Sequence, residues 1–492
     1  MQTPSPPTLD ELFARSVLRQ PQALALCDAP DKHRITGTAP LRLTYSEADQ
    51  AVSALGVHFA EAGLAPGSIV AVQLPNTVDL ILTLLAASRA GITVALLPLL
   101  WRQADLASAL HRIGARAIIT ARQIDGVNHA ELALQAAAET FSVRYVGGFG
   151  HAMPDGVVPL TEIMEGPADN VPASADPNRA AVVTFDVTMD GPRAIPRSHI
   201  QLIAGGLAVQ RASDLPTGAT LASATLPLAF GPLASSFVLW LLGGGTLVLH
   251  HPFDEDVLAR QLAEEACEGL VIPAPLAFRI AETALFDGLP ILRRVVGLWR
   301  APEQVLSSPR WPSTHAAFSD VYLFGEAGLV GVPRRSDGAV NGLFEGPYGA
   351  AGRTGHPAGE IAVTPQGTLA LRGPMVPLAA YTPLFRAEDA PPPEDVDTGY
   401  AVRRARVDNG LFITAPPNGL VSVGGYRFRS DDLQDWARRL SQGAMLTALP
   451  DRMNGHRLAG RATENDRARS AFLDLGLNPL MVEAFRDRTS GN

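Results

Sequence analysis

Lysine and cysteine are scarce in this chain, and the spacing of the cysteines and of the paired histidines excludes several kinds of chemistry. Lys32 is the only lysine among 40 basic residues, so a lysine-dependent step would have to use that position. Cys27 and Cys267 lie far apart without metal-ligand spacing. The His250-His251 pair has no third ligand beside it. With no recognisable Ser-His-Asp or Cys-His arrangement, the sequence indicates neither a zinc centre nor a covalent acyl-transfer triad.

Composition and charge narrow the class of protein. The 492 residues exceed one ordinary domain, and 47% hydrophobic against 18% charged residues is typical of a globular chain with a large core. The net charge of -9 argues against nucleic acid or an anionic membrane surface as the main partner. The N-terminus shows no apolar signal core, no run of about 18 apolar residues is present, and two cysteines are too few for a disulfide framework. We therefore expect a cytoplasmic protein.

Strand-like and helix-like segments alternate over much of the chain. Ser68–Leu74 is predicted to be a buried strand and Val78–Ala90 a buried helix. The alternation resumes at Ala180–Phe185 and continues to Ser319–Leu323, whereas short strands and turns fill Gly346–Tyr381. This order predicts an α/β fold with parallel sheets that carry helices on their faces, followed by a β-rich part.

Short motifs along the chain occur in the order found in one enzyme superfamily. They include VAVQLPN at Val70–Asn76, RAGITVALL at Arg89–Leu97 and LRGP at Leu371–Pro374. Over roughly residues 8–440 the sequence resembles the adenylate-forming superfamily, which includes the acyl-CoA synthetases. The domain plan, cofactors and site residues of that superfamily are therefore expected at the matching positions of this chain, as implications of the resemblance.

The resemblance implies a large N-terminal domain and a small C-terminal lid. The large domain would span residues 1–418, with layered sheets flanked by helices and a barrel-like, β-rich part near 330–418. The lid would be an α+β domain over residues 419–492, shorter than the lid that the family usually carries.

In that superfamily, ATP and a carboxylate react to form an acyl-adenylate and pyrophosphate, and the acyl group then passes to a thiol, usually that of coenzyme A. The resemblance therefore implies ATP, Mg²⁺ and coenzyme A as cofactors and a small carboxylate or acyl thioester as ligand. It implies neither a nucleic acid nor a membrane partner and is compatible with a homodimer. The chemistry requires a phosphate cradle, a metal-binding carboxylate, a ribose anchor and a lysine that stabilises the transferring charge.

The counterpart of the family's phosphate loop is Phe185–Ala194, FDVTMDGPRA. Its candidate phosphate-binding residues are Thr188, Gly191 and Arg193, of which the threonine and arginine are also candidate catalytic residues. Only one glycine remains, although successive glycines would let backbone N–H groups face a phosphate. Asp186 and Asp190 are expected where the triphosphate would lie, and two unit charges about 4 Å apart repel by about 4 kcal/mol at an effective dielectric near 20. The loop is predicted not to hold phosphate unless these aspartates bind a magnesium ion.

The adenine, acyl and metal region also differs from the family pattern. Trp299 and Arg300 stand where the family has two glycines, and Trp299 is either a core residue or a wall of the acyl pocket. The family's Y-G-x-T-E motif has two registers here. The preferred one starts at Tyr322 and keeps the metal-binding carboxylate as Glu326, which is otherwise a helix-capping loop residue; the other puts Gly328 at that position. The candidate nucleotide contacts here are Trp299, Arg300 and Tyr322, and the candidate substrate-pocket residues are Phe230, Trp299 and Phe324.

The ribose anchor, hinge and terminal lysine are changed as well. Tyr400 replaces the Asp of the family's T-G-D motif; it is a candidate ribose contact, but its ring would occupy ribose space. At the hinge, Pro416 replaces a ribose-binding Arg and Gly419 replaces the pivot Asp, although a glycine still permits rotation. The family's C-terminal catalytic lysine has no counterpart, because the single lysine lies at the other end of the chain.

Two functions remain open from the sequence. The first is a divergent AMP-forming acid–thiol ligase, in which Thr188, Arg193 and Glu326 contact phosphate and magnesium and Tyr400 contacts ribose. Each lost transition-state contact typically raises the activation free energy by about 3–4 kcal/mol, so the loss of several contacts would leave little catalysis. The second is a non-adenylating protein that binds an acyl group or acyl-CoA, or that regulates an active enzyme.

Overall fold

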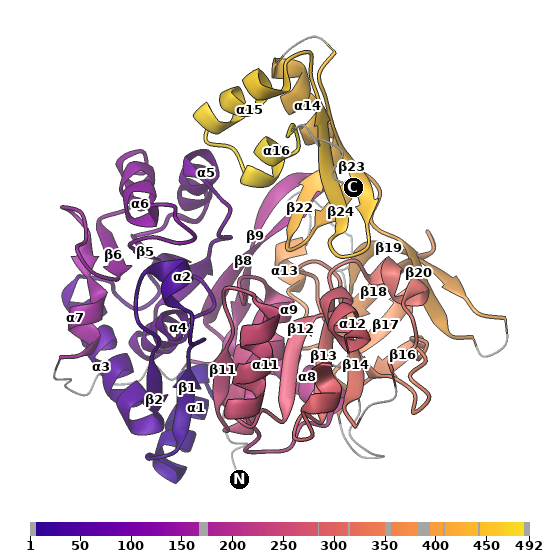
Figure 1. The fold of residues 1–492 in the computed structure, drawn as a ribbon, viewed down its shortest axis with the longest axis horizontal. Coiled ribbons are helices and arrows are strands. Elements are labelled where there is room, and N and C mark those ends of the chain that lie inside the picture. The colour runs from indigo at the N-terminus through magenta and orange to yellow at the C-terminus, as the bar shows by residue number, and fades with distance from the viewer. Residues whose placement is uncertain are drawn as a thin grey trace.

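The computed structural model describes residues 6–166, 176–283, 285–312, 315–349, 356–381, 394–406, 409–440 and 443–486. Within these residues, four sheets form the fold. Three of them belong to the broad lower body in Figure 1, and the fourth lies in the yellow C-terminal part above it. The α/β architecture with a larger N-terminal part and a smaller C-terminal part is therefore confirmed.

The first large sheet has seven strands in the order β7-β6-β5-β3-β4-β8-β9. Neighbouring strands are parallel except β8 and β9, which form an antiparallel hairpin at one edge. Its strands are β3 (Ile69–Gln73), β4 (Thr93–Leu96), β5 (Ala117–Ala121), β6 (Tyr145–Phe149), β7 (Val158–Pro159), β8 (Ala180–Thr188) and β9 (Gly191–Ser198). The helices that precede, connect or follow these strands are α3 (Tyr45–Glu61), α4 (Val78–Ala90), α5 (Gln103–Ile113), α6 (His129–Ala138), α7 (Leu160–Met164) and α8 (His199–Ser213).

Local sequence explains where these helices begin and end. The apolar helix α4 is buried along its whole length and ends at Gly91, which has the left-handed φ of 74° that closes a helix C-terminus. Helix α8 begins directly after the hairpin with a capping box, in which the Ser198 side chain accepts from the Gln201 N–H and the Gln201 side chain accepts from the Ser198 N–H. The end of β9 is thereby fixed to the start of a buried helix.

The second large sheet has eight strands in the order β15-β14-β13-β12-β10-β11-β1-β2. It is parallel except for its two edge strands, β15 and β2. Its strands are β1 (Leu24–Cys27), β2 (Arg42–Thr44), β10 (Leu221–Ser223), β11 (Leu247–Leu249), β12 (Gly269–Pro273), β13 (Arg294–Trp299), β14 (Ala317–Leu323) and β15 (Leu329–Pro333). The associated helices are α1 (Leu9–Arg19), α2 (His33–Thr36), α9 (Phe230–Leu233), α10 (Leu239–Gly243), α11 (Glu255–Glu264) and α12 (Ala274–Glu282), with a π-helix at Ala234–Val238 and 3-10 helices at Leu285–Gly288 and Pro302–Ser307.

The β-rich part is an antiparallel sheet in the order β16-β17-β18-β19-β20, accompanied by a short helix. Its elements are β16 (Gly346–Tyr348), β17 (Gly359–Val363), β18 (Thr368–Arg372), α13 (Leu378–Tyr381), β19 (Val396–Arg404) and β20 (Leu411–Ala415).

The C-terminal part, here called the lid, packs three helices on a four-stranded sheet in the order β22-β21-β24-β23. Its elements are β21 (Leu420–Val423), β22 (Tyr426–Arg429), α14 (Ser430–Leu440), β23 (Met445–Asp451), β24 (Gly455–Arg461), α15 (Asn465–Asp474) and α16 (Pro479–Glu483). The lid has its own hydrophobic core, in which Phe472 and Phe485 are fully buried. The boundary between residues 418 and 419 stays a prediction. Over the described ranges, no helix combines the length and apolar character needed to cross a bilayer.

Candidate active-site cleft

The predicted phosphate loop is a tight β-hairpin. Strands β8 and β9 pair up to Thr188 and Gly191, so only Met189 and Asp190 form the turn. The Thr188 hydroxyl donates to the Gly191 carbonyl at 3.2 Å, within the hairpin itself. Because successive N–H groups of an extended strand point to opposite sides, this hairpin does not present a row of N–H donors to one phosphate.

The two aspartates of the hairpin have different environments. Asp190 lies in the turn with its side chain 84% exposed, and it forms an ion pair of 3.2 Å with Arg193. The Arg193 guanidinium also donates to the Ala380 carbonyl at 2.9 Å. Asp186, in contrast, is buried where the hairpin meets Glu326 and the lid residue Arg427, the region here called the cleft. The expectation that both carboxylates face one point is therefore wrong for Asp190, because the hairpin turn carries it into solvent.

Asp186 is the centre of a buried polar network. Its carboxylate accepts from the Arg427 guanidinium at 2.9 Å, from the Tyr381 hydroxyl at 2.7 Å and from the Glu326 N–H at 3.3 Å. Burial and the neighbouring Asp186 charge raise the pKa of Tyr381 well above its ordinary value, so its hydroxyl stays a donor. The negative charge of Asp186 is thus neutralised from within the protein.

Glu326 lies in the turn between β14 and β15 and points into the same region. Its carboxylate accepts from the Thr184 hydroxyl, from Arg197 Nη1 at 3.1 Å and from the Phe230 N–H at 3.1 Å. Arg197 also donates to the Glu326 backbone carbonyl, and its guanidinium stacks 4.0 Å from the centre of the Phe230 ring. Burial raises the pKa of Glu326 to about 7, although Arg197 opposes the shift.

Tyr400 and Arg427 fill the region where the resemblance predicts a ribose anchor. Tyr400 is only 1% exposed, and its ring meets Phe324 edge-on with centroids 5.4 Å apart. The Tyr400 hydroxyl accepts from Arg427 Nη2 at 3.1 Å. Arg427 also packs against Gly325, where an added Cβ would lie 2.4 Å from its Nη1 atom. A side chain at position 325 would therefore displace the guanidinium.

Further contacts hold the lid against the large body. The Tyr426 hydroxyl accepts from the Leu100 N–H at 2.9 Å. On the other side, Gln304 in the 3-10 helix Pro302–Ser307 donates to the Asp451 carbonyl at 2.9 Å. Together with the Arg427–Asp186 pair, these contacts hold one arrangement of the lid with its β22 strand in the cleft.

Trp299 faces the core and also borders a cavity. Its indole N–H donates to Asp320 at 2.7 Å, and its ring packs 6.0 Å from that of Phe278. Asp320 is held in turn by Arg334 at 2.9 Å. Tyr322 lies beside Trp299 on the neighbouring strand and is 4% exposed, which makes it a core residue as well.

Arg300, the next residue, lies where β13 reaches the lid. Its Nη2 donates to the Thr225 hydroxyl at 3.3 Å. Beside it is a cavity of about 130 Å³ between the large body and the lid. The lining residues are Pro273, Pro275, Leu276, Leu298, Trp299, Arg300, Ala301, Gln304, Gly424, Met453, Asn454 and Gly455.

The predicted site residues thus separate into groups. Glu326, Phe230, Phe324 and Tyr400 converge on the buried network, and Trp299 and Arg300 border the cavity. The remaining candidates, Thr188, Gly191 and Arg193, belong to the hairpin end, and Tyr322 lies in the core. Sequence reasoning missed Arg197, Tyr381 and Arg427, whose roles depend on partners distant in the sequence.

The residues present do not fit a bound ATP–Mg²⁺ complex in this arrangement. Magnesium is usually held by carboxylate oxygens together with phosphate oxygens. Here Asp186 is paired with Arg427, and Glu326 with Arg197. Among the residues that the structure describes, no group of three or more His, Cys, Asp or Glu side chains could hold a metal ion.

Comparison with known proteins identifies the family. The model for the AMP-binding enzyme family matches residues 13–322, which is more than half of the chain. The chain belongs to the AMP-binding enzyme family, and the predicted membership in the adenylate-forming superfamily is confirmed.

Individual relatives agree with this assignment. The 2-hydroxy-7-methoxy-5-methyl-1-naphthoate--CoA ligase of Streptomyces carzinostaticus is 26% identical over 475 residues, covering 91% of this chain and 82% of that protein. The salicylyl-CoA synthase / salicylate adenylyltransferase of a Streptomyces species is 25% identical over 437 residues, covering 83% and 77%. The solved structure of the amide bond synthetase McbA from Marinactinospora thermotolerans shares the fold, with a TM-score of 0.70, 19% identity and coverage of 96% and 94%.

Proposed function

We propose that this family member does not catalyse ATP-dependent adenylation and acts by binding a small acyl or aryl ligand, alone or as the partner of an active enzyme. The observation that carries the proposal is the position of Arg427. A lid arginine occupies the cleft and bridges Asp186 and Tyr400, where the family would hold phosphate and ribose.

Binding of a nucleotide would have to disrupt this network. The ion-paired side chains of Arg427 and Asp186 are only 14% and 6% exposed. Separating a buried pair so that one charge stays unpaired typically costs about 3–5 kcal/mol. A triphosphate would also meet the Asp186 carboxylate without the convergent N–H donors that a phosphate loop supplies. Both effects oppose ATP binding in this arrangement.

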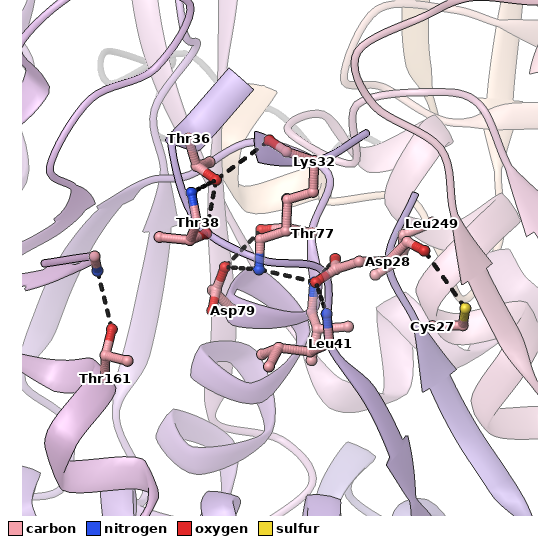
Figure 2. A network of polar contacts seen from close by, with 12 residues as sticks. Cys27, Asp28, Lys32, Thr36, Thr38, Leu41, Thr77, Asp79, Thr161 and Leu249 are labelled. Carbon is pink, nitrogen blue, oxygen red and sulfur yellow. Dashed lines mark hydrogen bonds and ion pairs between the residues drawn. The ribbon is translucent and has the colours of Figure 1, made fainter. Parts of the chain in front are cut away.

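The absence of a lysine at the expected catalytic position also argues against adenylation. Lys32 forms ion pairs with Asp28 and Asp79 at 2.8 Å each, inside the large body (Figure 2). Its side chain is 1% exposed, so it contributes to packing rather than to a reacting phosphate. The transferring charge would therefore lack the lysine that the family chemistry uses.

The alternative is an AMP-forming ligase that uses ATP, Mg²⁺ and coenzyme A. Family membership favours it, as do the names of the two Streptomyces relatives, which describe a naphthoate–CoA ligase and a salicylyl-CoA synthase. Under that alternative the lid would have to withdraw Arg427 before the nucleotide enters.

Carboxylate-dependent exchange of pyrophosphate into ATP distinguishes the two functions. We expect no exchange above the no-carboxylate blank with a panel of aryl and short-chain acids, because the cleft holds neither a phosphate cradle nor a free lysine. The Streptomyces salicylyl-CoA synthase with salicylate serves as the positive control. Exchange that depends on any one carboxylate would establish the ligase reaction instead.

A further inference from the structure

Four asparagines of the chain are followed directly by a glycine. They are Asn341, Asn409, Asn418 and Asn454. Glycine has no side chain to shield its backbone nitrogen, so this nitrogen can attack the side-chain amide of the preceding asparagine and close a succinimide ring. In a folded protein the reaction requires that the asparagine amide and the glycine backbone are free to move toward each other. The structure of each turn therefore determines which of the four pairs reacts.

Two of the pairs, in or beside the β-rich part, are held by hydrogen bonds or by close packing. The Asn341 side-chain amide donates to the Pro333 carbonyl at 2.6 Å. Gly410, which follows Asn409, is buried, and its carbonyl accepts from the Ala405 N–H at 2.7 Å. Ring closure at either pair would first have to break one of these bonds.

The pair in the β23–β24 turn is held through its backbone. The Asn454 N–H donates to the Asp451 carboxylate at 2.9 Å, and the Asn454 carbonyl accepts from the Gly424 N–H at 2.8 Å. Gly455, which follows, is buried, and an added Cβ there would lie 3.0 Å from the Ala301 side chain. This glycine has little space in which to move.

Asn418 lies in an exposed turn at the start of the lid. The turn is closed by the Leu420 N–H, which donates to the Pro417 carbonyl at 3.1 Å, and Gly419 has a left-handed φ of 75°. Within the described part of the chain, neither the Asn418 side-chain amide nor the Gly419 N–H forms a hydrogen bond. A Cβ added at Gly419 would lie 2.9 Å from the terminal Cε of Met189, a side chain that is itself 50% exposed. Because the end of this side chain can move, the Asn418 pair is free to close the ring.

We propose that Asn418 is a site of spontaneous deamidation that changes how the lid is attached. The backbone nitrogen of Gly419 bonds to Cγ of Asn418, the bond from Cγ to the side-chain nitrogen breaks, and that nitrogen leaves as ammonia with the proton of the Gly419 N–H. Water then opens the ring at one of its two carbonyl carbons and leaves aspartate or isoaspartate. The net reaction consumes one water and releases one ammonia, so it needs no oxidant, enzyme or cofactor. It is independent of whether the protein adenylates a carboxylate.

Isoaspartate at position 418 adds one carbon to the backbone directly before Gly419. This shift acts on the Leu420–Pro417 bond that closes the turn and on the Ser430 N–H, which donates to the Gly419 carbonyl at 2.9 Å. It also displaces Gly419 from the side chain of Met189 at the hairpin tip. Deamidation therefore loosens the start of the lid at β21 and α14.

Peptide mapping by mass spectrometry tests the site after the full chain has been incubated in mildly alkaline buffer. We expect deamidation at Asn418 to be at least about tenfold faster than at the other three pairs, because these must first break the contacts that hold them. The rate should rise with pH, since the attacking nitrogen must lose its proton. Asn418→Gln should stop the reaction at this position, because the longer side chain closes a six-membered ring much more slowly. The other three pairs of the same variant are matched internal controls and should react as in the unmodified protein.

Hydrogen exchange of fresh and aged protein measures the effect on the lid. The amides of Leu420 and Ser430 should exchange about fivefold faster after ageing, as expected for the loss of one hydrogen bond, and aged Asn418→Gln should keep the rates of fresh protein. The proposal is overturned if Asn418 does not deamidate, if another of the four pairs reacts as fast, or if these two amides exchange equally in deamidated and fresh protein. Exchange of pyrophosphate into ATP would contradict the proposed function and leave this site standing.

Discussion

Replacing Lys32 with methionine is expected to destabilise the protein by about 3–5 kcal/mol, because two buried carboxylates lose their common cation. Lys32 Nζ lies 2.8 Å from an oxygen of Asp28 and 2.8 Å from one of Asp79, and Figure 2 shows the amine between them. Asp28 also accepts from the backbone N–H groups of Leu41 and Val78. The network therefore joins the segment after β1 to the start of α4, and a methionine would leave it with uncompensated negative charge.

Arg34→Met is the matched control for this prediction. Arg34 lies two residues further along, pairs with Asp31 at 3.0 Å and is 54% exposed. Exposed ion pairs contribute at most about 1 kcal/mol, so this variant should unfold close to the unmodified protein. Urea unfolding followed by tryptophan fluorescence measures both. If Lys32→Met and Arg34→Met lower the free energy of unfolding equally, the prediction is contradicted, because burial of Lys32 would then add nothing to stability.

The pKa of Lys32 explains why this residue is a structural group. Burial alone would lower its pKa, but the charges of Asp79 and Asp28 outweigh burial and raise it. A lysine held charged between two carboxylates is neither a nucleophile nor available to a phosphate. The only lysine of the chain thus stabilises the fold that carries the cleft.

Replacing Arg427 with methionine is expected to release the lid from the cleft. The substitution removes the partner of Asp186 and the donor to Tyr400, and it should weaken docking of the lid by about 3 kcal/mol. Hydrogen exchange should therefore become faster in β21 and β22, while the core strands of the large sheets keep their protection.

Arg429→Met is the control for lid release. Arg429 lies on the same strand, but it pairs with Asp432 within the lid at 3.7 Å. Its removal should leave exchange in β21 unchanged. A double variant, Asp186→Asn with Arg427→Met, should recover part of the protection, since it leaves no buried charge unpaired. Identical exchange in the Arg427 and Arg429 variants would exclude the Arg427–Asp186 pair as the contact that holds the lid.

Much of the fold is predictable from local patterns in the sequence. Apolar runs and a terminal glycine predict the buried helix at Val78–Ala90 and the strand before it, and both are present. Short runs separated by turns likewise indicate the β-rich character after Gly346. These features depend on neighbouring residues, which is why a single sequence is sufficient to predict them.

The site is harder to predict because its contacts are long-range. Asp186 and Arg427 are separated by 241 positions, and nothing in either local sequence indicates the pairing. Trp299 has two interpretations from sequence, and the structure shows why they are hard to separate: its indole bonds to Asp320 in the core while the residue also borders the cavity. Arg197 shares its strand with a second arginine, Arg193, so the sequence does not distinguish it, and its partner Glu326 lies 129 positions away.

Calorimetric titration of the unmodified protein with ATP–Mg²⁺ tests most directly whether the cleft is closed to nucleotide. Arg427, Asp186, Tyr400 and Glu326 bind one another or their neighbours in the cleft, so we expect them to leave no site for the triphosphate and ribose. The expected result is no saturable binding, with any dissociation constant weaker than about 1 mM. A dissociation constant in the micromolar range would contradict this expectation, because the network would then open for ATP at little cost.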